Sequence, residues 1–196
     1  MKKIIFLLII TLVSLNINAQ DSIPKMELKY NGFKGIGIDS LKAFVVLKIP
    51  VKKKNELYTN VLVYLNSIYS YPEKVLNTVE NEVIIINGLT KSIKDKSGLY
   101  DYVLNYRIDL KFKDGKIRIE PSITDLNEIF SSINSRKKIY VANTDSPKKV
   151  EINCIWMSNK NDNGYWLSKN DLKLNLDNWI NNYISNLVVG IKKNDW

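Results

Sequence analysis

The stretch from residue 99 to residue 120 constrains the fold of this chain more than any other. Every second side chain from Tyr100 to Phe112 is apolar or aromatic, and most of the side chains between them are charged or polar. This alternation predicts a long β-strand with one buried and one solvated face. Asp114-Gly115 then forms a favoured two-residue hairpin turn, which places Phe112 opposite Ile117. The turn and the apolar pattern therefore predict the same hairpin register.

The charged side chains of this hairpin are the candidate ligand-facing residues: Asp101, Arg107, Asp109, Lys111, Arg118 and Glu120. Acids and bases alternate in this set, which favours cross-strand ion pairs on a solvated sheet. Paired carboxylates such as Asp109 and Glu120 are also the groups that glycosidases use, so a carboxylate-dependent hydrolase remains an alternative.

Three tyrosines share the apolar face of the long strand with Leu104 and Ile108: Tyr100, Tyr102 and Tyr106. Aromatic rings stack on sugars and on bases. The aliphatic neighbours, however, need burial, so we expect the three rings to pack in the core. A ligand-facing role is the alternative.

Segments before this hairpin supply a further strand and the first helix. Ala43–Ile49 is apolar and β-branched, which predicts a strand. Apolar residues recur at helical spacing between about 55 and 70, with Asn55 as the expected N-cap and Pro72 beyond the end. The apolar stripe of this helix is expected to lie on the sheet.

The remaining segments are assigned by the same patterns. Residues 121–134 are expected to leave the sheet as a short helix or an ordered loop. Apolar residues at helical spacing from 172 to 191 predict a long amphipathic helix. Two further hairpins are predicted, one from residues 74–79 and 82–87 and one from residues 149–157 and 165–168.

Residues 1–19 have the pattern of a secretory signal peptide. Lys2 and Lys3 precede the apolar run Ile4–Val13, and Ala19 offers a small residue for cleavage. The run is short for a membrane anchor, and no cysteine follows the cleavage point to carry a lipid. We therefore expect a periplasmic or secreted protein. Residues 20–42 form a lead-in and residues 43–196 a single domain, with a variable insertion at about 135–170.

The chain is basic, with 29 Lys and Arg residues against 20 Asp and Glu residues and a formal charge of +9. A basic balance suggests polyanionic partners. Only three of the basic residues are Arg, the residue preferred for bidentate phosphate recognition. Solvated surface lysines are the simpler interpretation. A polyanion-binding site, glycan-binding in particular, is the alternative, with lysine clusters at 52–54, 137–138 and 148–149.

Two residue types are scarce enough to exclude whole classes of site. The chain has no histidine, which excludes a Ser-His-Asp triad and a His-ligated metal. Cys154 is the only cysteine, so no intramolecular disulfide forms. It lies in an apolar run, where a buried and inert thiol is expected. We expect neither catalysis nor a cofactor or metal site.

Three strings resemble a family of secreted bacterial proteins that is known only as a domain of unknown function: ELYTNVLVYLNSIYS, EVIIING and YRIDLKFKDGKIRIEPSITDL. Members carry a signal peptide, a helix that begins near Glu-Leu-Tyr and a strand-turn-strand that closes with Asp-Gly-Lys. The resemblance covers residues 43–125. It implies a TATA-box-binding-protein-like (TBP-like) fold, in which helices pack on one side of a curved antiparallel sheet. It implies no activity and no catalytic residues.

Together these patterns predict an α+β domain. We expect a curved antiparallel sheet of five to seven strands with two main helices packed on one face. The leading hypothesis for function is a non-catalytic binding module of the cell envelope, with an envelope protein, a peptide or a glycan as its partner. Nucleic acid is not expected as a partner, because the protein is exported. The oligomeric state stays open.

Overall fold

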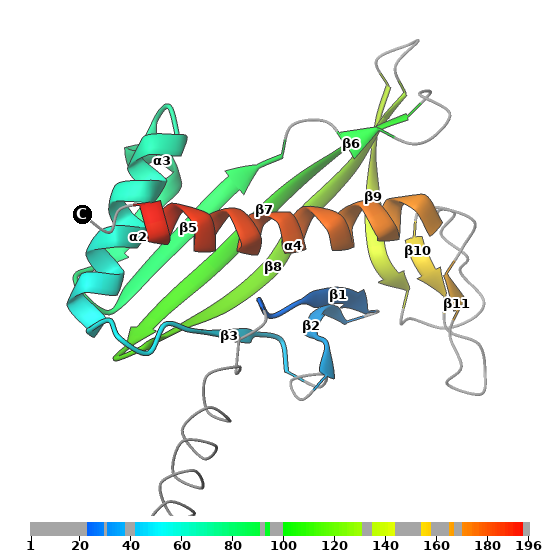
Figure 1. Cartoon of the computed structure of the whole chain (residues 1–196). Helices are drawn as coiled ribbons and strands as arrows, with labels where there is room; N and C mark the ends of the chain where they lie inside the picture. Colours follow the sequence, from blue (N-terminus) through cyan, green and yellow to red (C-terminus); the bar gives the residue numbers. More distant parts are fainter. Residues whose placement is uncertain are drawn as a thin grey trace, which may run out of the picture.

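The chain folds into one layer of sheet and one layer of helices in the computed structural model (Figure 1). The structure describes residues 23–29, 31–37, 42–90, 93–94, 100–130, 135–143, 154–157, 165–166 and 170–193. The predicted signal peptide lies outside these residues. The α+β class and the antiparallel sheet are confirmed.

The main sheet has a path of seven strands with two further strands paired beside it. The path runs β11-β10-β9-β8-β7-β5-β4, while β3 pairs with β8 and β6 pairs with β7. The pairs are antiparallel, except that β9 and β10 are parallel. The bounds are β3 Val45–Lys48, β4 Leu76–Val79, β5 Val83–Leu89, β6 Ile93–Lys94, β7 Tyr100–Lys113, β8 Lys116–Phe130, β9 Ser135–Asn143, β10 Cys154–Met157 and β11 Tyr165–Trp166.

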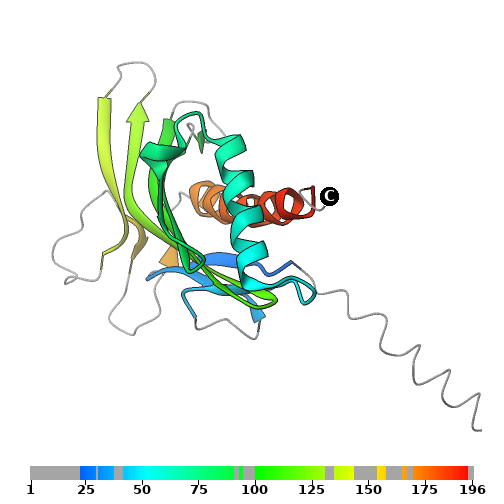
Figure 2. The same ribbon diagram turned by 90° about the vertical axis from the view of Figure 1, so that its left-hand side faces the viewer.

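The helices cover one face of this sheet. They are α2 Lys54–Ile68, the single turn α3 Pro72–Val75 and α4 Asn170–Lys193. Figure 2 shows the curved sheet on one side and α2 and α4 together on the other, as predicted for the two main helices. Ring contacts join the layers, with Tyr58 of α2 on Phe112 and Trp179 of α4 on Tyr106. No helix in the described part of the chain is both long enough and apolar enough to cross a membrane.

The β7–β8 hairpin confirms the predicted register, with Phe112 opposite Ile117. The prediction that residues 121–134 leave the sheet is wrong up to Phe130, because β8 continues to that residue. The cause is a β-bulge: Asn105 pairs with Asp125 and Tyr106 with Ile123, which leaves Thr124 unpaired. The extra residue moves the apolar core positions of β8 from the odd-numbered Ile117 and Ile119 to the even-numbered Leu126, and this breaks the alternation that marks a strand.

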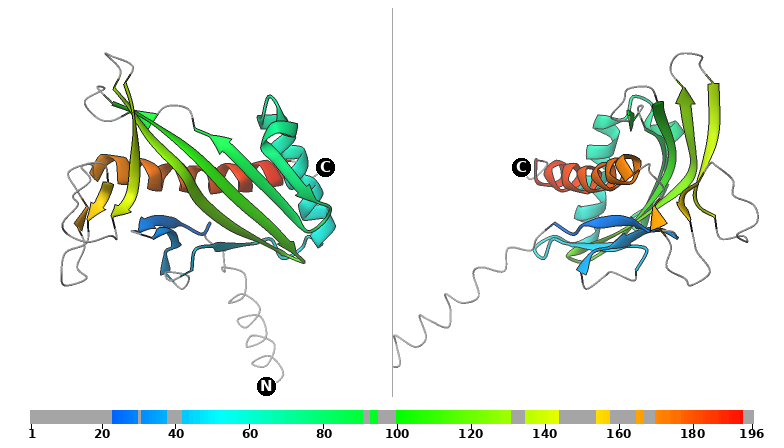
Figure 3. Two further views of the ribbon diagram at one scale, coloured as in Figure 1. Left: turned by 180° about the vertical axis from the view of Figure 1, so that it is seen from behind. Right: turned by 90° about the vertical axis from the view of Figure 1, so that its right-hand side faces the viewer.

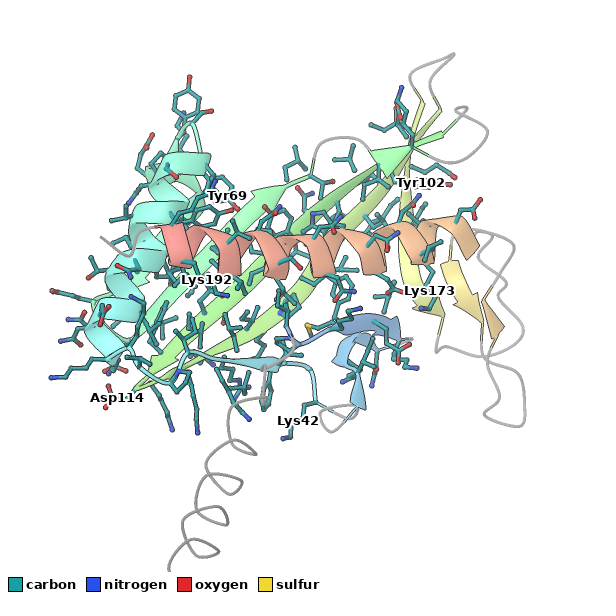
Figure 4. The ribbon with its side chains drawn as sticks, viewed as in Figure 1. Lys42, Tyr69, Tyr102, Asp114, Lys173 and Lys192 are labelled. Carbon is teal, nitrogen blue, oxygen red and sulfur yellow. The ribbon has the colours of Figure 1, made fainter. Side chains whose placement is uncertain are left out.

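The start of α2 corrects a second prediction. Asn55 lies inside the helix, and the N-cap residue Lys53 makes no side-chain cap. Instead, Asp114 Oδ1 accepts a hydrogen bond of 2.8 Å from the backbone N–H of Lys54. The hairpin turn thereby caps a helix that is distant in sequence (Figure 4). At φ +67°, Gly115 closes against Pro50, whose Cα lies 3.2 Å from where a Cβ would stand.

The lead-in contains a small hairpin that belongs to the core. Its strands, β1 Met26–Lys29 and β2 Gly32–Gly35, form a separate two-stranded sheet. The side chains of Asp177 and Asn181 on α4 accept hydrogen bonds from the backbone N–H groups of β1, at 2.6 and 2.9 Å. Polar residues of the last helix therefore satisfy the strand edge that faces them.

The other predicted hairpins form with altered bounds. The first joins β4 and β5 and begins two residues later than predicted, because residues 72–75 form α3. The second joins β10 and β11, with Trp156 opposite Trp166. Strand β9 was not predicted, and it lies in the segment expected as an insertion. The environment of the Cys154 thiol lies outside the described side chains.

Candidate functional site

The face of the main sheet opposite α2 and α4, which we call the outer face, carries the charged side chains of the hairpin. The left view of Figure 3 has the outer face toward the viewer, with the strands in front of α4. Because directly opposed residues point to the same face, the register arranges the side chains in rows across β5, β7, β8 and β3. All of the predicted ligand-facing residues except Asp101 occupy such rows.

The structure brings five of these six residues together. Arg107, Asp109 and Lys111 alternate along β7, Glu120 lies opposite Asp109, and Arg118 lies opposite Lys111. The sixth residue, Asp101, pairs with Ile129 near the other end of the hairpin. Eight residues of strand separate it from Asp109, about 26 Å.

The two central carboxylates are engaged by cations. Asp109 accepts two hydrogen bonds from Arg107, from Nε at 2.7 Å and from Nη2 at 3.1 Å. Glu120 accepts a hydrogen bond of 2.7 Å from Arg118 Nη2, and Lys111 Nζ lies 3.6 Å from the same oxygen. A general acid or nucleophile must reach a substrate, so this arrangement favours the ion-pair interpretation over the hydrolase alternative.

Next to these ion pairs the outer face is hollowed by a pocket of about 370 Å³, which we call the basic pocket. Its row across the sheet reads Val83, Lys111, Arg118 and Val46, so that a valine flanks the two cations on each side. The pocket is lined by Val46, Glu82, Val83, Lys111, Phe112, Lys113, Lys116 and Arg118. Four cations thus surround a partly aliphatic floor with one carboxylate.

Aromatic stacking holds the arginine of the basic pocket in place. The guanidinium carbon of Arg118 lies 3.7 Å from the centre of the Phe44 ring. A guanidinium over an aromatic face is stabilised by the ring quadrupole and loses conformational freedom. Arg118 is therefore oriented before any ligand arrives.

Two of the pocket lysines were missing from the predicted set. Lys113 and Lys116 flank the turn and lie directly opposite each other. The predicted register already implied this pairing, so the sequence contained the information. The pocket itself required the neighbouring strands β3 and β5, whose register the sequence did not give.

Three lysines of the clusters predicted as polyanion sites pair with carboxylates. Lys52 pairs with Glu56 at 2.6 Å, and Lys54 pairs with Glu82. Lys138 Nζ lies 3.2 Å from Asp125. The side chain of Lys137 and the pair at 148–149 lie outside the described part of the chain.

The inner face contains a cluster of three tyrosines, of which Tyr106 is buried and Tyr69 and Tyr183 are partly buried. The Tyr69 hydroxyl lies 3.2 Å from that of Tyr106 and 3.3 Å from that of Tyr183 (Figure 4 labels Tyr69). Burial raises the pKa of Tyr106 and of Tyr183, and the neighbouring Tyr69 adds to both shifts. Tyr102 and Tyr106 are buried, which confirms core packing for these two rings. The Tyr100 side chain lies outside the described residues.

Acidic and sulfur ligands do not gather anywhere in the described residues in a way that would hold a metal ion. The carboxylates Asp109 and Glu120 of the outer face are paired with cations, and the basic pocket would repel a further cation. The cations of this face attract anions and can donate hydrogen bonds.

The fold is similar to that of a solved TBP-like protein. A TBP-like protein from Parabacteroides distasonis ATCC 8503 superimposes with a TM-score of 0.53 and 11% identity, over 76% of this chain and 90% of that one. A DUF4468 family protein from Bacteroides ovatus ATCC 8483 gives a TM-score of 0.43 and 10% identity, over 76% and 82%. No curated protein matches the chain.

The family model of DUF4468, described as a domain of unknown function with TBP-like fold, matches residues 44–128. The match contains β3, α2 and almost the whole β7–β8 hairpin, and it confirms the family resemblance of the sequence. Residues 44–128 of this chain are therefore similar to DUF4468, a domain of unknown function with TBP-like fold.

Proposed function

We propose that the protein is an exported, non-catalytic binding module of the cell envelope that holds its ligand on the outer face of the sheet. The observation that carries this proposal is the position of the basic pocket. It hollows the face that α2 and α4 leave uncovered, among the conspicuous charges of the hairpin.

The asymmetry of the sheet supports binding at this face. The inner positions of β7 are occupied by packing, as Leu104, Ile108 and Leu110 are fully buried. The outer positions contribute charged groups at fixed spacing on a rigid scaffold. Binding sites on strands are held in place better than sites on loops.

The ion pairs support a non-catalytic role. Both oxygens of Asp109 accept hydrogen bonds from Arg107, one oxygen of Glu120 accepts from Arg118, and the chain offers no histidine as an alternative base. The export half of the proposal rests on the sequence of residues 1–19.

Export is tested by expressing the full chain in a bacterial host and measuring the mass of the product in the periplasmic and culture fractions. We expect a product that begins at Gln20. A product of full mass confined to the cytoplasm would contradict export.

Binding is tested by screening glycan, peptide and small-molecule libraries for ligands that raise the melting temperature. The site is then mapped with bulky substitutions, Val46→Trp and Ser122→Trp on the outer face. Ser67→Trp on α2 is the matched control, because Ser67 and Ser122 are both exposed and both bond a backbone carbonyl.

We expect an outer-face substitution to weaken binding and Ser67→Trp to leave it unchanged. A ligand that loses affinity only with Ser67→Trp would place the site on the helical side and contradict the proposal. Failure of every library to stabilise the protein would contradict it as well.

A further inference from the structure

The strand register around the basic pocket places like charges directly opposite one another. Lys111 faces Arg118, Lys113 faces Lys116, and Lys116 also faces Lys48 on its other side. Like charges in opposed positions of an antiparallel sheet destabilise it. Three such contacts in adjacent rows form an arrangement that a negative charge would stabilise.

The carboxylates nearest to the pocket are already bound elsewhere. Glu82 pairs with Lys54 of α2, Asp114 caps the same helix, and Glu120 is shared by Arg118 and Lys111. Among the described residues, no carboxylate lies within ion-pair distance of Lys113 or Lys116. These two lysines therefore keep their charge available at the pocket.

The floor of the pocket is apolar. Val83 lies beside Lys111, and Val46 lies beside Arg118. A ligand for this site should therefore combine negative charge with a small apolar part. A volume of about 370 Å³ is that of a small-molecule site.

Resting on the proposed function, we propose that the basic pocket binds a phosphate monoester whose apolar part packs on Val46 and Val83. A dianion matches the two lysines that have no carboxylate partner. The prepositioned guanidinium of Arg118 offers hydrogen bonds of a geometry that suits phosphate oxygens. The ester is either a soluble molecule or the headgroup of a lipid.

Phenyl phosphate is a direct probe of this site, and isothermal titration calorimetry on the purified full chain measures its affinity. Phenol tests the apolar part alone, and inorganic phosphate tests the charge alone. We expect each of these to bind roughly tenfold or more weakly than phenyl phosphate. Binding of phenyl phosphate should also weaken as salt is added.

The variant Lys113→Gln/Lys116→Gln removes the two available charges. We expect it to lose roughly tenfold or more in affinity for phenyl phosphate. Its melting temperature should stay equal or rise, because a like-charge contact is removed. Lys25→Gln/Lys192→Gln is the matched control, with the same change of charge at two exposed lysines outside the pocket.

Vesicles of phosphatidylcholine with and without phosphatidic acid distinguish a lipid headgroup from a soluble phosphate ester as the ligand. Binding to the phosphatidic acid vesicles that depends on Lys113 and Lys116 supports the lipid source. Binding of phenyl phosphate alone supports a soluble ester.

Two outcomes overturn the assignment. One is that neither phenyl phosphate nor the vesicles bind, and the other is that they bind the double variant and the control equally. A library ligand could also lose affinity with Ser122→Trp and keep its affinity with Lys113→Gln/Lys116→Gln. This result would contradict the phosphate-binding proposal and support the proposed binding function of the outer face.

Discussion

The inner and outer faces of the β7–β8 hairpin are built from neighbouring residues, but they differ in burial and in charge. Ile108 and Leu110 on the inner face are fully buried under the helices. Asp109 and Lys111 alternate with them along β7 and lie on the outer face, where they form solvent-accessible ion pairs. The inner face supplies apolar burial and the outer face supplies charge. Stability and binding should therefore respond to mutation independently.

The largest difference is expected between two adjacent residues. Ile108→Ala empties a fully buried position and should lower the free energy of unfolding by about 2–5 kcal/mol. Arg107→Ala removes an exposed ion pair and should change it by less than about 0.5 kcal/mol. Urea denaturation measures both, and equal losses would end the distinction between the faces.

Gly88→Ala tests how tightly the inner face is packed. A Cβ at this position would lie 2.3 Å from Tyr106 Cζ, so the ring must move. We expect a loss of about 1–3 kcal/mol in the free energy of unfolding. The loss should shrink when Gly88→Ala is combined with Tyr106→Leu, which a double-mutant cycle reports.

Alkaline pH tests the buried tyrosine on the inner face. The pKa of Tyr106 is raised in the folded protein, so its neutral form stabilises the fold. That contribution is fully present below the unfolded pKa of about 10 and is lost as pH rises above it. Above this pH, unfolding free energy should fall less steeply in Tyr106→Phe than in the wild type, by up to about 1.4 kcal/mol per pH unit. Identical slopes would mean that Tyr106 ionises equally in both states.

Asp114→Ala removes the cap that the hairpin turn gives to α2. We expect a loss of about 0.5–2 kcal/mol in unfolding free energy. Asp114→Asn keeps an acceptor oxygen and a favoured Asn-Gly turn, so it should behave like the wild type. If both variants lost the same amount, the cap would not explain the effect.

A small effect is also expected from a second ion pair on the outer face. Glu120→Gln weakens the contacts with Arg118 and Lys111 and should lower the unfolding free energy by about 0.2–1 kcal/mol. The difference from the wild type should decrease in high salt, because exposed ion pairs are screened. If this difference in unfolding free energy does not change with salt concentration, the effect arises from packing and not from the ion pairs.

The sequence predicted those elements whose periodicity is unbroken. The alternation of β7, the Asp114-Gly115 turn and the helical spacing of α4 each agree with the structure. In β7 and α4 the apolar positions of the pattern form one buried face. The prediction from the sequence was wrong where the alternation of inner and outer positions shifts by one residue. The extra residue at Thr124 shifts the buried positions of β8, and a pattern shifted in this way resembles a helix more than a strand.

The candidate site was predictable along the hairpin and not across it. Positions on β7 and β8 follow from the turn, so the pairing of Lys111 with Arg118 could be derived from the sequence. Val46 and Val83 reach the pocket through β3 and β5, which join the hairpin from distant segments. The cap of α2 by Asp114 is a tertiary contact of the same kind, and no local rule could favour it over Asn55.

The contacts between β1 and α4 bear on where a folding unit can be cut. Met26 and Leu28 are fully buried, and α4 adds a row of buried residues from Leu172 to Ile191. All of these lie outside residues 44–128, the segment that the family model matches. A recombinant fragment with those ends would present the apolar side of its sheet to water, and we expect it to aggregate. Expression boundaries should therefore be chosen to retain both β1 and α4.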